Sequence, residues 1–459
     1  MGIGGKTDAV HEATESARRS RARPSTLAAL VVAAGLVTFG ACGSRTPVYA
    51  PVAPPAPKVT DLGTLGSNRY TMPSAVSGSI VVGESGTEEK AGDHHAFVYD
   101  LAAPAPRMVA LGTFGGAQSR AVAVSGTIVV GMAETAPVAP VAPVAPVAPV
   151  APAPGEHGFA YDVAAASPKM IDLGPMVVTA ISGHLVVGYT TTASGHERAA
   201  AVDLAAPSPT VQDLDIAQTG DMYSLATAVS GTMVIGRINE DDGAEHVFAY
   251  DLGAATPKLV DLGHGTPSGL DGAIAVGDVF VAADNGLHAY AWDLGSNPPR
   301  AFDLGTLGPP GGGYYSRATG ISGHVVVGTA STQPAIGCNQ RSAPDCTEHA
   351  FAYDLRAADP ALRDLGTLGG TTSQAAGISG NLVVGAADAT SGRIHAFVYD
   401  LGGAHPAMRD LGALPGDDSS TAIAISANTV IGLSGEELVV RHGIGGGVFR
   451  PVAWTLAKA

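Results

Sequence analysis

Residues 120–131 (RAVAVSGTIVVG), 157–163 (HGFAYDV) and 169–174 (KMIDLG) together form the unit that decides the fold. Each run is rich in β-branched or aromatic residues and is bounded by Gly, Asp or Ser, as a strand between tight turns would be. Ser125-Gly126 divides the first stretch, and a glycine that tolerates positive φ suits a hairpin turn there. The unit therefore predicts four consecutive antiparallel strands, named a to d in chain order.

The same unit returns along the chain. Its most regular marker is the triplet Asp-Leu-Gly, or a near variant, in strand d, which occurs eight times at intervals of 41 to 62 residues. These triplets begin at Asp61, Ala110, Asp172, Asp213, Asp261, Asp303, Asp364 and Asp410. Four-stranded sheets at such a period are typical of the blades of a β-propeller, in which each sheet buries its faces against its neighbours.

The two ends of the repeat region complete each other. Residues 58–63, KVTDLG, form a strand d with no strand a, b or c before it, whereas the last unit has strands a to c but no strand d. Pairing the two would close a ring and remove two exposed sheet edges. We therefore predict one all-β domain over residues 58–459, a β-propeller of eight four-stranded blades. Seven blades or an open array are the alternatives.

Strand c carries a family resemblance. Intact His-Ala-Phe triplets begin at His95, His349 and His395, and weaker copies begin at His157, His246 and His288. With these motifs, the chain from Lys58 to about Leu456 resembles the HAF family, a bacterial repeat expected outside the cell. The resemblance implies export and a repeat fold, and it implies no activity. The third and eighth units depart from the family, because Arg198 and Arg450 take the His position.

The N-terminal segment indicates export. A basic stretch beginning at Arg18 is followed by about fifteen apolar residues, which is short for a membrane span. The segment ends in Phe39-Gly40-Ala41-Cys42, which resembles the bacterial lipoprotein box and implies lipidation of Cys42. We therefore expect an export signal at 1–41, and a lipidated Cys with a Pro-rich tether at 42–57. Secretion without the anchor is the alternative, because the box usually has Leu at the place of Phe39.

The charge of the chain limits its partners. Formal net charge is −16, and removal of residues 1–41 takes away five basic and three acidic residues, which leaves −18. Such a charge opposes binding to nucleic acid or to anionic lipid surfaces. We expect a monomer with no nucleic-acid partner, which contacts the membrane only through its lipid anchor.

Two insertions fall in connections between strands b and c. Residues 331–347 contain Cys338 and Cys346, for which a disulfide is expected in an oxidising compartment. Residues 136–154 form a Val-Ala-Pro tract, which suits an extended polyproline arm. Insertions gathered on one face of a ring are typical of a binding face, and sequence drift is the alternative.

Three polar columns repeat with the blades. We interpret the His column as structural, donating to backbone at the start of strand c, because equivalent residues of a ring lie too far apart to share a metal. The Asp that closes strand c is expected to accept N–H groups of the following turn. This Asp stands at Asp100, Asp162, Asp203, Asp251, Asp293, Asp354 and Asp400. The third column, before strand a, is expected in turns or in the lining of the channel: Thr71, Ser119, Ser224, Ser316, Ser373 and Ser420.

Aromatic and basic residues gather in the connections between strands d and a, on the same face as the insertions. Such residues dominate binding energetics. The predicted ligand-binding residues are Arg69, Tyr70, Arg120, Tyr223, Tyr314, Tyr315 and Arg317. No metal site is predicted. Acidic runs at 240–242 and 417–418 could take calcium, but they lack the spacing of a calcium loop, and no other cofactor is expected.

No recognised catalytic motif is present: the sequence has no Gly-x-Ser-x-Gly elbow, His-Glu-x-x-His pair, Walker loop or dinucleotide fingerprint. It therefore favours a noncatalytic cell-envelope lipoprotein whose propeller is a binding platform for an envelope protein, peptide or glycan. A propeller hydrolase or lyase acting on extracellular polysaccharide or peptide is the alternative. That enzyme would require acids or His residues gathered at the mouth of the channel. A purely structural repeat is the third possibility.

Overall fold

The computed structural model describes residues 56–66, 70–87, 93–136, 155–214, 223–239, 244–334, 347–436 and 449–457. All of these belong to one of two compact units, residues 54–459. Across these described ranges no helix is long and apolar enough to cross a membrane. The predicted export signal, Cys42, the tract from 137 to 154, and the pair Cys338 and Cys346 lie outside them.

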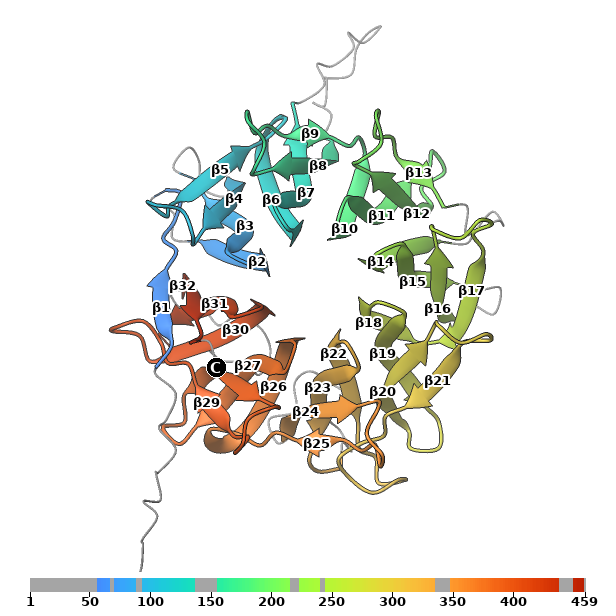
Figure 1. Ribbon diagram of the computed structural model, residues 1–459, viewed down its shortest axis with the longest axis vertical. Helices are drawn as coiled ribbons and strands as arrows, with labels where there is room; N and C mark the ends of the chain where they lie inside the picture. The colour runs from blue at the N-terminus through green and yellow to red at the C-terminus, as the bar shows by residue number, and fades with distance from the viewer. Residues whose placement is uncertain are drawn as a thin grey trace, which may run out of the picture. The chain divides into compact units, whose positions relative to one another are not determined.

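The strands of this unit form eight four-stranded antiparallel sheets, arranged as the blades of a propeller (Figure 1). We number the blades 1 to 8 from β2 onward. Strands a and b are β2 (Thr71–Ser77) and β3 (Ile80–Gly86), β6 (Gly115–Ser125) and β7 (Ile128–Thr135), β10 (Met176–Ser182) and β11 (Leu185–Thr191), β14 (Ser224–Ser230) and β15 (Met233–Asn239), β18 (Thr266–Asp271) and β19 (Ile274–Val281), β22 (Ser316–Ser322) and β23 (Val325–Ser331), β26 (Gly369–Ser379) and β27 (Leu382–Ala389), and β30 (Ser419–Ser426) and β31 (Thr429–Gly435).

Strands c and d complete each sheet toward the outside of the ring (Figure 1). In the same blade order they are β4 (His94–Asp100) and β5 (Met108–Gly112), β8 (Glu156–Asp162) and β9 (Ile171–Asp172), β12 (Glu197–Asp203) and β13 (Gln212–Asp213), β16 (Glu245–Asp251) and β17 (Leu259–His264), β20 (Gly286–Asp293) and β21 (Arg300–Asp303), β24 (Glu348–Asp354) and β25 (Arg363–Asp364), β28 (Ile394–Asp400) and β29 (Met408–Asp410), and β32 (Phe449–Thr455) and β1 (Lys58–Asp61).

Blade 8 is completed by the first strand of the unit. β1 pairs antiparallel with β32, with Lys58 opposite Thr455, and the N–H of Leu62 donates to the carbonyl of Pro451 at 2.9 Å. The prediction of eight blades closed by the N-terminal strand is therefore confirmed. The seven-bladed and open alternatives are wrong.

The two inner strands of every blade bend at the same point. Strand a carries a one-residue register shift, as between Ala375 and Gly377 in β26. Across from this bulge, a Cβ on Gly385 would lie 1.9 Å from the carbonyl oxygen of Gln374. No side chain fits at that distance. The close approach therefore explains the glycine that follows the hydrophobic pair in each strand b.

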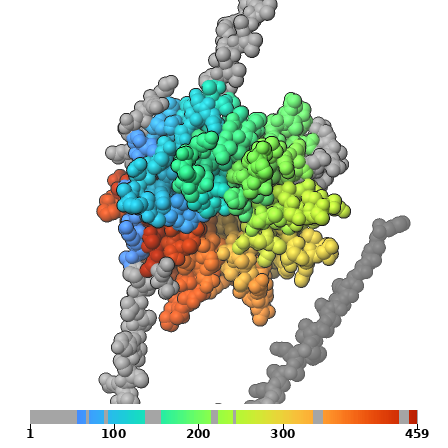
Figure 2. All heavy atoms as spheres, turned by 45° about the horizontal axis from the view of Figure 1, so that its top comes forward, coloured from blue at the N-terminus to red at the C-terminus, as the bar shows by residue number. Residues whose placement is uncertain are grey.

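Hydrophobic layers between neighbouring blades form the core. Phe351 of blade 6, for example, is fully buried in one cluster with Val326 of its own blade and Val276 of blade 5. Because each layer takes side chains from two blades, one blade cannot bury its core alone. Figure 2 shows the described blades as adjoining sectors of one surface, in chain order.

A circuit of hydrogen bonds runs around the ring at the a–b turns. The N–H of the residue after strand a donates to the side chain that ends strand a of the preceding blade, at 2.6–3.0 Å. The eight pairs are Gly78 to Ser426, Gly126 to Ser77, Gly183 to Ser125, Gly231 to Ser182, Gly272 to Ser230, Gly323 to Asp271, Gly380 to Ser322, and Ala427 to Ser379. In six blades a Ser-Gly pair therefore links blades as well as turning the hairpin, and Asp271-Gly272 and Ser426-Ala427 take its place in blades 5 and 8.

Candidate functional site

The histidines of strand c pair with the aspartates of strand d in their own blades. His349 Nδ1 lies 2.8 Å from Asp364 Oδ2, while Asp364 Oδ1 accepts the N–H of Gly366 at 2.7 Å. The same pairs are His157 with Asp172, His246 with Asp261, His288 with Asp303, and His395 with Asp410. In these five blades Nδ1 of the histidine thus faces a carboxylate, which the sequence did not predict, whereas the predicted backbone partner is present for His395, whose Nε2 lies 3.1 Å from the carbonyl oxygen of Asp418. Strand d runs antiparallel beside strand c, which brings the carboxylate of Asp-Leu-Gly to the imidazole ring.

The His column is not uniform around the ring. In blade 1, Ala110 replaces the strand d aspartate beside His95. In blade 8, Arg450 replaces the histidine, and its Nη1 lies 3.5 Å from Asp61 Oδ2. The pairing thus follows the residue types present at the two positions of each blade.

The aspartates that close strand c hold the turn into strand d. Asp354 Oδ1 accepts the N–H of Arg356 at 2.9 Å. The equivalent bond, to the N–H two residues on, is made by Asp100, Asp162, Asp203, Asp251, Asp293 and Asp400. These carboxylates are therefore engaged in turn geometry at each of these positions.

The hydroxyl column before strand a lies between blades. Ser373 Oγ accepts the N–H of Ala350 from the neighbouring blade at 2.9 Å and donates to the carbonyl of Gly366 at 2.5 Å. Ser119, Ser224, Ser316 and Ser420 accept the corresponding N–H group. Because these serines and Thr71 are at most 3% exposed, the expected alternative of a channel lining is wrong.

The described ranges contain no group of three His, Cys, Asp or Glu residues arranged to hold a metal ion. Of the two acidic runs considered for calcium, residues 240–242 lie outside these ranges. In the other run, Asp417 and Asp418 form ion pairs with Arg450 and Arg393. Their carboxylates are thus already engaged by guanidinium groups.

Two of the predicted tyrosines repeat one arrangement on the loop-rich face, by which we mean the side of the ring that carries the b–c and d–a connections. Each precedes strand a and donates its hydroxyl to the glutamate that opens strand c of the same blade. Tyr223 donates to Glu245 at 3.3 Å, and Tyr315 donates to Glu348. Burial, followed by the charge of the glutamate, raises the pKa of both phenols. They are therefore hydrogen-bond donors at neutral pH.

Tyr189 of strand β11, in blade 3, was not among the site residues predicted from the sequence. Burial, followed by the charge of Glu197, raises the pKa of Tyr189. The ion pairs on either side, Arg120 with Glu156 and Arg237 with Glu245, also contribute to the electrostatic environment of this phenol. Together with Tyr223, these residues form what we call the blade 2–4 patch.

Tyr189 and Arg237 carry a signal that could have been found. Both directly follow the glycine that each strand b contains. The position after this glycine holds Glu84, Met132, Tyr189, Arg237, Asp278, Thr329, Ala386 and Leu433 in the eight blades. The residue type at this position changes from blade to blade, whereas the neighbouring positions repeat. Such variation within a repeat indicates a position that the scaffold does not dictate.

Tyr70 lies in blade 1, apart from this patch in the chain. Its side chain is 47% exposed, and its hydroxyl donates to Glu84 at 2.5 Å. Burial of the hydroxyl and the hydrogen bond to Glu84 raise the pKa of Tyr70 to about 12. Arg69 lies outside the described residues.

Tyr314 has a packing role that the prediction did not include. A Cβ on Gly308 would lie 2.3 Å from the Tyr314 ring, and one on Gly312 would lie 2.6 Å from it. The phenol ring thus covers two glycines of its own loop. Of the seven predicted residues, Arg120 and Tyr223 join the blade 2–4 patch, whereas Tyr315 and Arg317 belong to blade 6.

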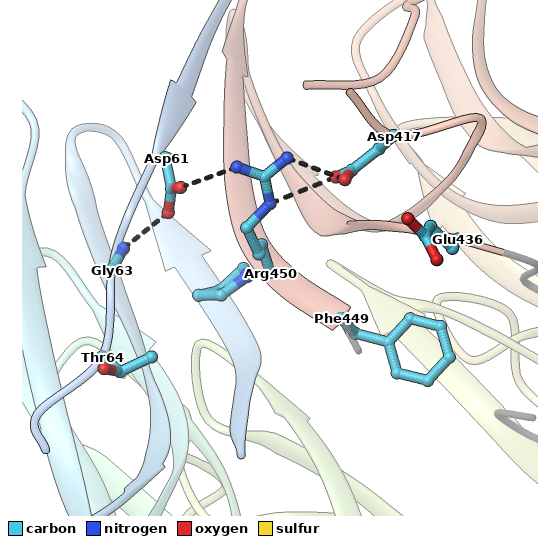
Figure 3. Close-up of a pocket in the computed structure, with 8 residues that line it drawn as sticks. Asp61, Gly63, Thr64, Asp417, Glu436, Phe449 and Arg450 are labelled. Carbon is cyan, nitrogen blue, oxygen red and sulfur yellow. Dashed lines mark hydrogen bonds and ion pairs between the residues drawn. The ribbon is translucent and has the colours of Figure 1, made fainter. Parts of the chain in front are cut away.

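A cavity of about 520 Å³ lies where the ring closes (Figure 3). Figure 3 shows the Arg450 guanidinium between Asp61 and Asp417, with Glu436 and Phe449 nearby. Arg450 Nη2 lies 2.7 Å from Asp417 Oδ1 and also donates to the carbonyl of Pro415. The main positive group of the cavity therefore ties β32 to β1 and to the loop before β30.

No family model and no curated protein matches this chain. Among solved structures, it is similar to a puromycin hydrolase mutant complexed with PGG, at 11% identity over 82% of this chain and 61% of that one (TM-score 0.46). It is also similar to a prolyl endopeptidase, at 13% identity over 79% and 52% (TM-score 0.45). A third is the propeller domain of the Trilobed protease from Pyrococcus furiosus, at 10% over 75% and 98% (TM-score 0.44). The chain thus spans about half of the prolyl endopeptidase, and these values carry no argument about function.

Proposed function

We propose that this protein is a noncatalytic binding protein of the bacterial cell envelope that holds a glycan on the loop-rich face of its propeller. The observation that carries the proposal is the blade 2–4 patch. It combines two guanidinium groups, three carboxylates and two phenols on three adjoining blades. Sugar hydroxyls both donate and accept hydrogen bonds, so a surface of paired donors and acceptors beside aromatic rings suits them.

The state of these groups supports binding over proton transfer. The raised pKa values of Tyr189 and Tyr223 keep both phenols protonated at neutral pH. Glu156 and Glu245 each form an ion pair with an arginine, Arg120 and Arg237 respectively, so their carboxylates are already engaged. Hydrolysis of a glycoside requires a carboxylic acid that gives up its proton to the leaving group. These residues are better suited to hydrogen bonding with a ligand that stays intact.

Export, with Cys42 as the lipid anchor, is part of the proposal and rests on the sequence of residues 18–42 and on the resemblance to the HAF family. Cells that produce the Cys42→Ala variant should release the protein from the membrane fraction. Equal membrane association of the variant and the natural protein would contradict the anchor.

A glycan array probed with the purified protein, followed by calorimetric titration of the bound glycans, tests the binding function. The double variant Tyr189→Ala and Arg237→Gln should weaken binding at least about tenfold, since central aromatic and Arg residues dominate such contacts. Arg107→Gln is the charge-matched control, because Arg107 is exposed in a c–d connection on the opposite face. Binding that survives the double variant would overturn the assignment to this patch, and cleavage of a bound glycan would make the protein an enzyme.

A further inference from the structure

Arg317 and Arg120 occupy the same place in the repeat, directly after the serine of the hydroxyl column (Ser316 and Ser119), but their surroundings differ. Arg120 pairs through Nη1 with Glu156 of its own blade. The equivalent carboxylate in blade 6, Glu348, instead accepts hydrogen bonds from Tyr315 and Gln374. The Arg317 guanidinium therefore has no carboxylate partner of this kind in its own blade.

Arg317 is held from the neighbouring blade by Asp278. This carboxylate is only 8% exposed. Its Oδ2 accepts from Arg317 Nε at 3.1 Å, and its Oδ1 accepts the N–H of Ala318 at 2.9 Å. Burial raises the pKa of Asp278, against the opposing effect of Arg317. Two bonds thus fix the position of Asp278 relative to the start of β22.

The outer end of the Arg317 guanidinium is available to a ligand. The side chain is 51% exposed. Nε is the only nitrogen of this group with a hydrogen bond to any residue in the described part of the chain. Nη1 and Nη2 form the planar fork that binds a carboxylate through two parallel hydrogen bonds. Asp278 therefore orients a guanidinium whose fork makes no hydrogen bond to the residues that the structure describes.

An exposed aromatic ring accompanies this fork. Phe280 is 57% exposed, which makes it one of the few exposed large hydrophobic side chains in the described ranges. It follows Asp278 by two residues in the regular strand β19, so both side chains leave the same face of the sheet, about 7 Å apart along the strand. Val276, on that face, packs against Ala318 of blade 6. Phe280 and Arg317 thus share the junction of blades 5 and 6.

We propose that Phe280 and Arg317 form a subsite for the acidic sugar of a glycan, with a hexuronate carboxylate in the Arg317 fork and the sugar ring against Phe280. The inference rests on the proposed glycan-binding function and adds the class of sugar. A planar carboxylate matches the fork, and the apolar C–H face of a sugar ring matches an aromatic face. Asp278 already takes Nε of the guanidinium, so the fork is left for one planar carboxylate, and the charge of Asp278 disfavours a doubly charged phosphate at the same place.

Calorimetric titration of the purified protein with tetragalacturonate tests this subsite, with cellotetraose as the neutral probe. Arg317→Lys keeps the charge but removes the fork, and it should weaken tetragalacturonate binding at least about tenfold. Phe280→Ser should weaken it several-fold, whereas Phe280→Tyr, which keeps the ring, should not. Arg300→Lys is the matched control, because Arg300 lies 5.1 Å from the ring of Phe302 on the outer strand β21, far along blade 5 from the fork. Thermal melts establish that each variant is folded.

Three results would overturn the subsite: equal binding of tetragalacturonate by Arg317→Lys, equal affinity of the natural protein for cellotetraose, or binding of a peptide C-terminus in place of the uronate. In each case the broader function is judged separately. If other glycans still bind and depend on Tyr189 and Arg237, the proposed function stands without this subsite. If no glycan binds, both proposals fail.

Discussion

Leu62 provides a direct test of ring closure. It follows β1, is 3% exposed, and packs in one cluster with Phe97 of blade 1 and Ile431 of blade 8. Leu62→Ala would remove a buried side chain in blade 8, whose outer strand β1 comes from the start of the domain and whose other three strands come from its end. Leu365 is the matched control, because it occupies the same triplet in blade 6, is 5% exposed, and belongs to a blade that is continuous in sequence.

A buried Leu→Ala change costs about 2–5 kcal/mol. For a domain of about 400 residues, the unfolding entropy is about 0.8 kcal/mol per kelvin, so the melting temperature should fall by about 2.5–6 °C. If β1 closes the ring in solution, Leu62→Ala and Leu365→Ala should lower the melting temperature by similar amounts. Differential scanning calorimetry of both variants measures this.

A melting temperature that falls for Leu365→Ala and stays within about 1 °C of the natural value for Leu62→Ala would refute the reasoning. It would mean that residues 58–63 contribute little to the folded domain. The ring would then be held by contacts between the inner strands alone.

Two further predictions concern the repeated polar columns. Ser373→Ala should leave the buried N–H of Ala350 without its acceptor and lower the free energy of unfolding by about 1–3 kcal/mol. Ser391→Ala, at an exposed serine, is the control and should not lower it. Equal midpoints of chemical denaturation for the two variants would contradict the role of Ser373 between blades. The hydrogen bond to Asp410 raises the pKa of His395. Burial acts to raise the pKa of Asp410, but the hydrogen bonds from His395 and Gly412 outweigh burial and lower this pKa. This pair should stabilise the fold most between about pH 4 and about pH 6.5, and lose its effect as pH rises through the pKa of His395 or falls through that of Asp410. From about pH 6 to about pH 9, the melting temperature should therefore decline more steeply for the natural protein than for Asp410→Asn. Coincident profiles of melting temperature against pH would exclude the effect.

Much of the fold could be predicted because its causes are local. The alternation within each strand, the Ser-Gly turns and the orphan strand at Lys58 are all read from neighbouring residues. The closing pairs, such as Lys58 with Thr455, follow once the missing strand of the last blade is recognised. The repeat also predicted where the loop-rich face would lie, because chain direction reverses at every strand.

The candidate site could be predicted only in part, since the partners of its residues come from other strands and other blades. Arg120 and Arg317 are equivalent in sequence, yet Arg120 pairs within its blade and Arg317 pairs with Asp278 across a blade junction. Tyr189 was not singled out, because its importance depends on Arg120 and Arg237 on either side.

The sequence by itself determined the strands, their order and the closed ring of eight blades, because backbone pattern and turn chemistry act between close neighbours. Tertiary structure decided what the polar residues do. It placed the carboxylate of Asp364 beside His349 and buried Ser373 between blades, and among the described residues it left the fork of Arg317 without a partner. The physical reason is that these choices depend on distances across packed sheets, between residues about 15 to 40 positions apart in the chain.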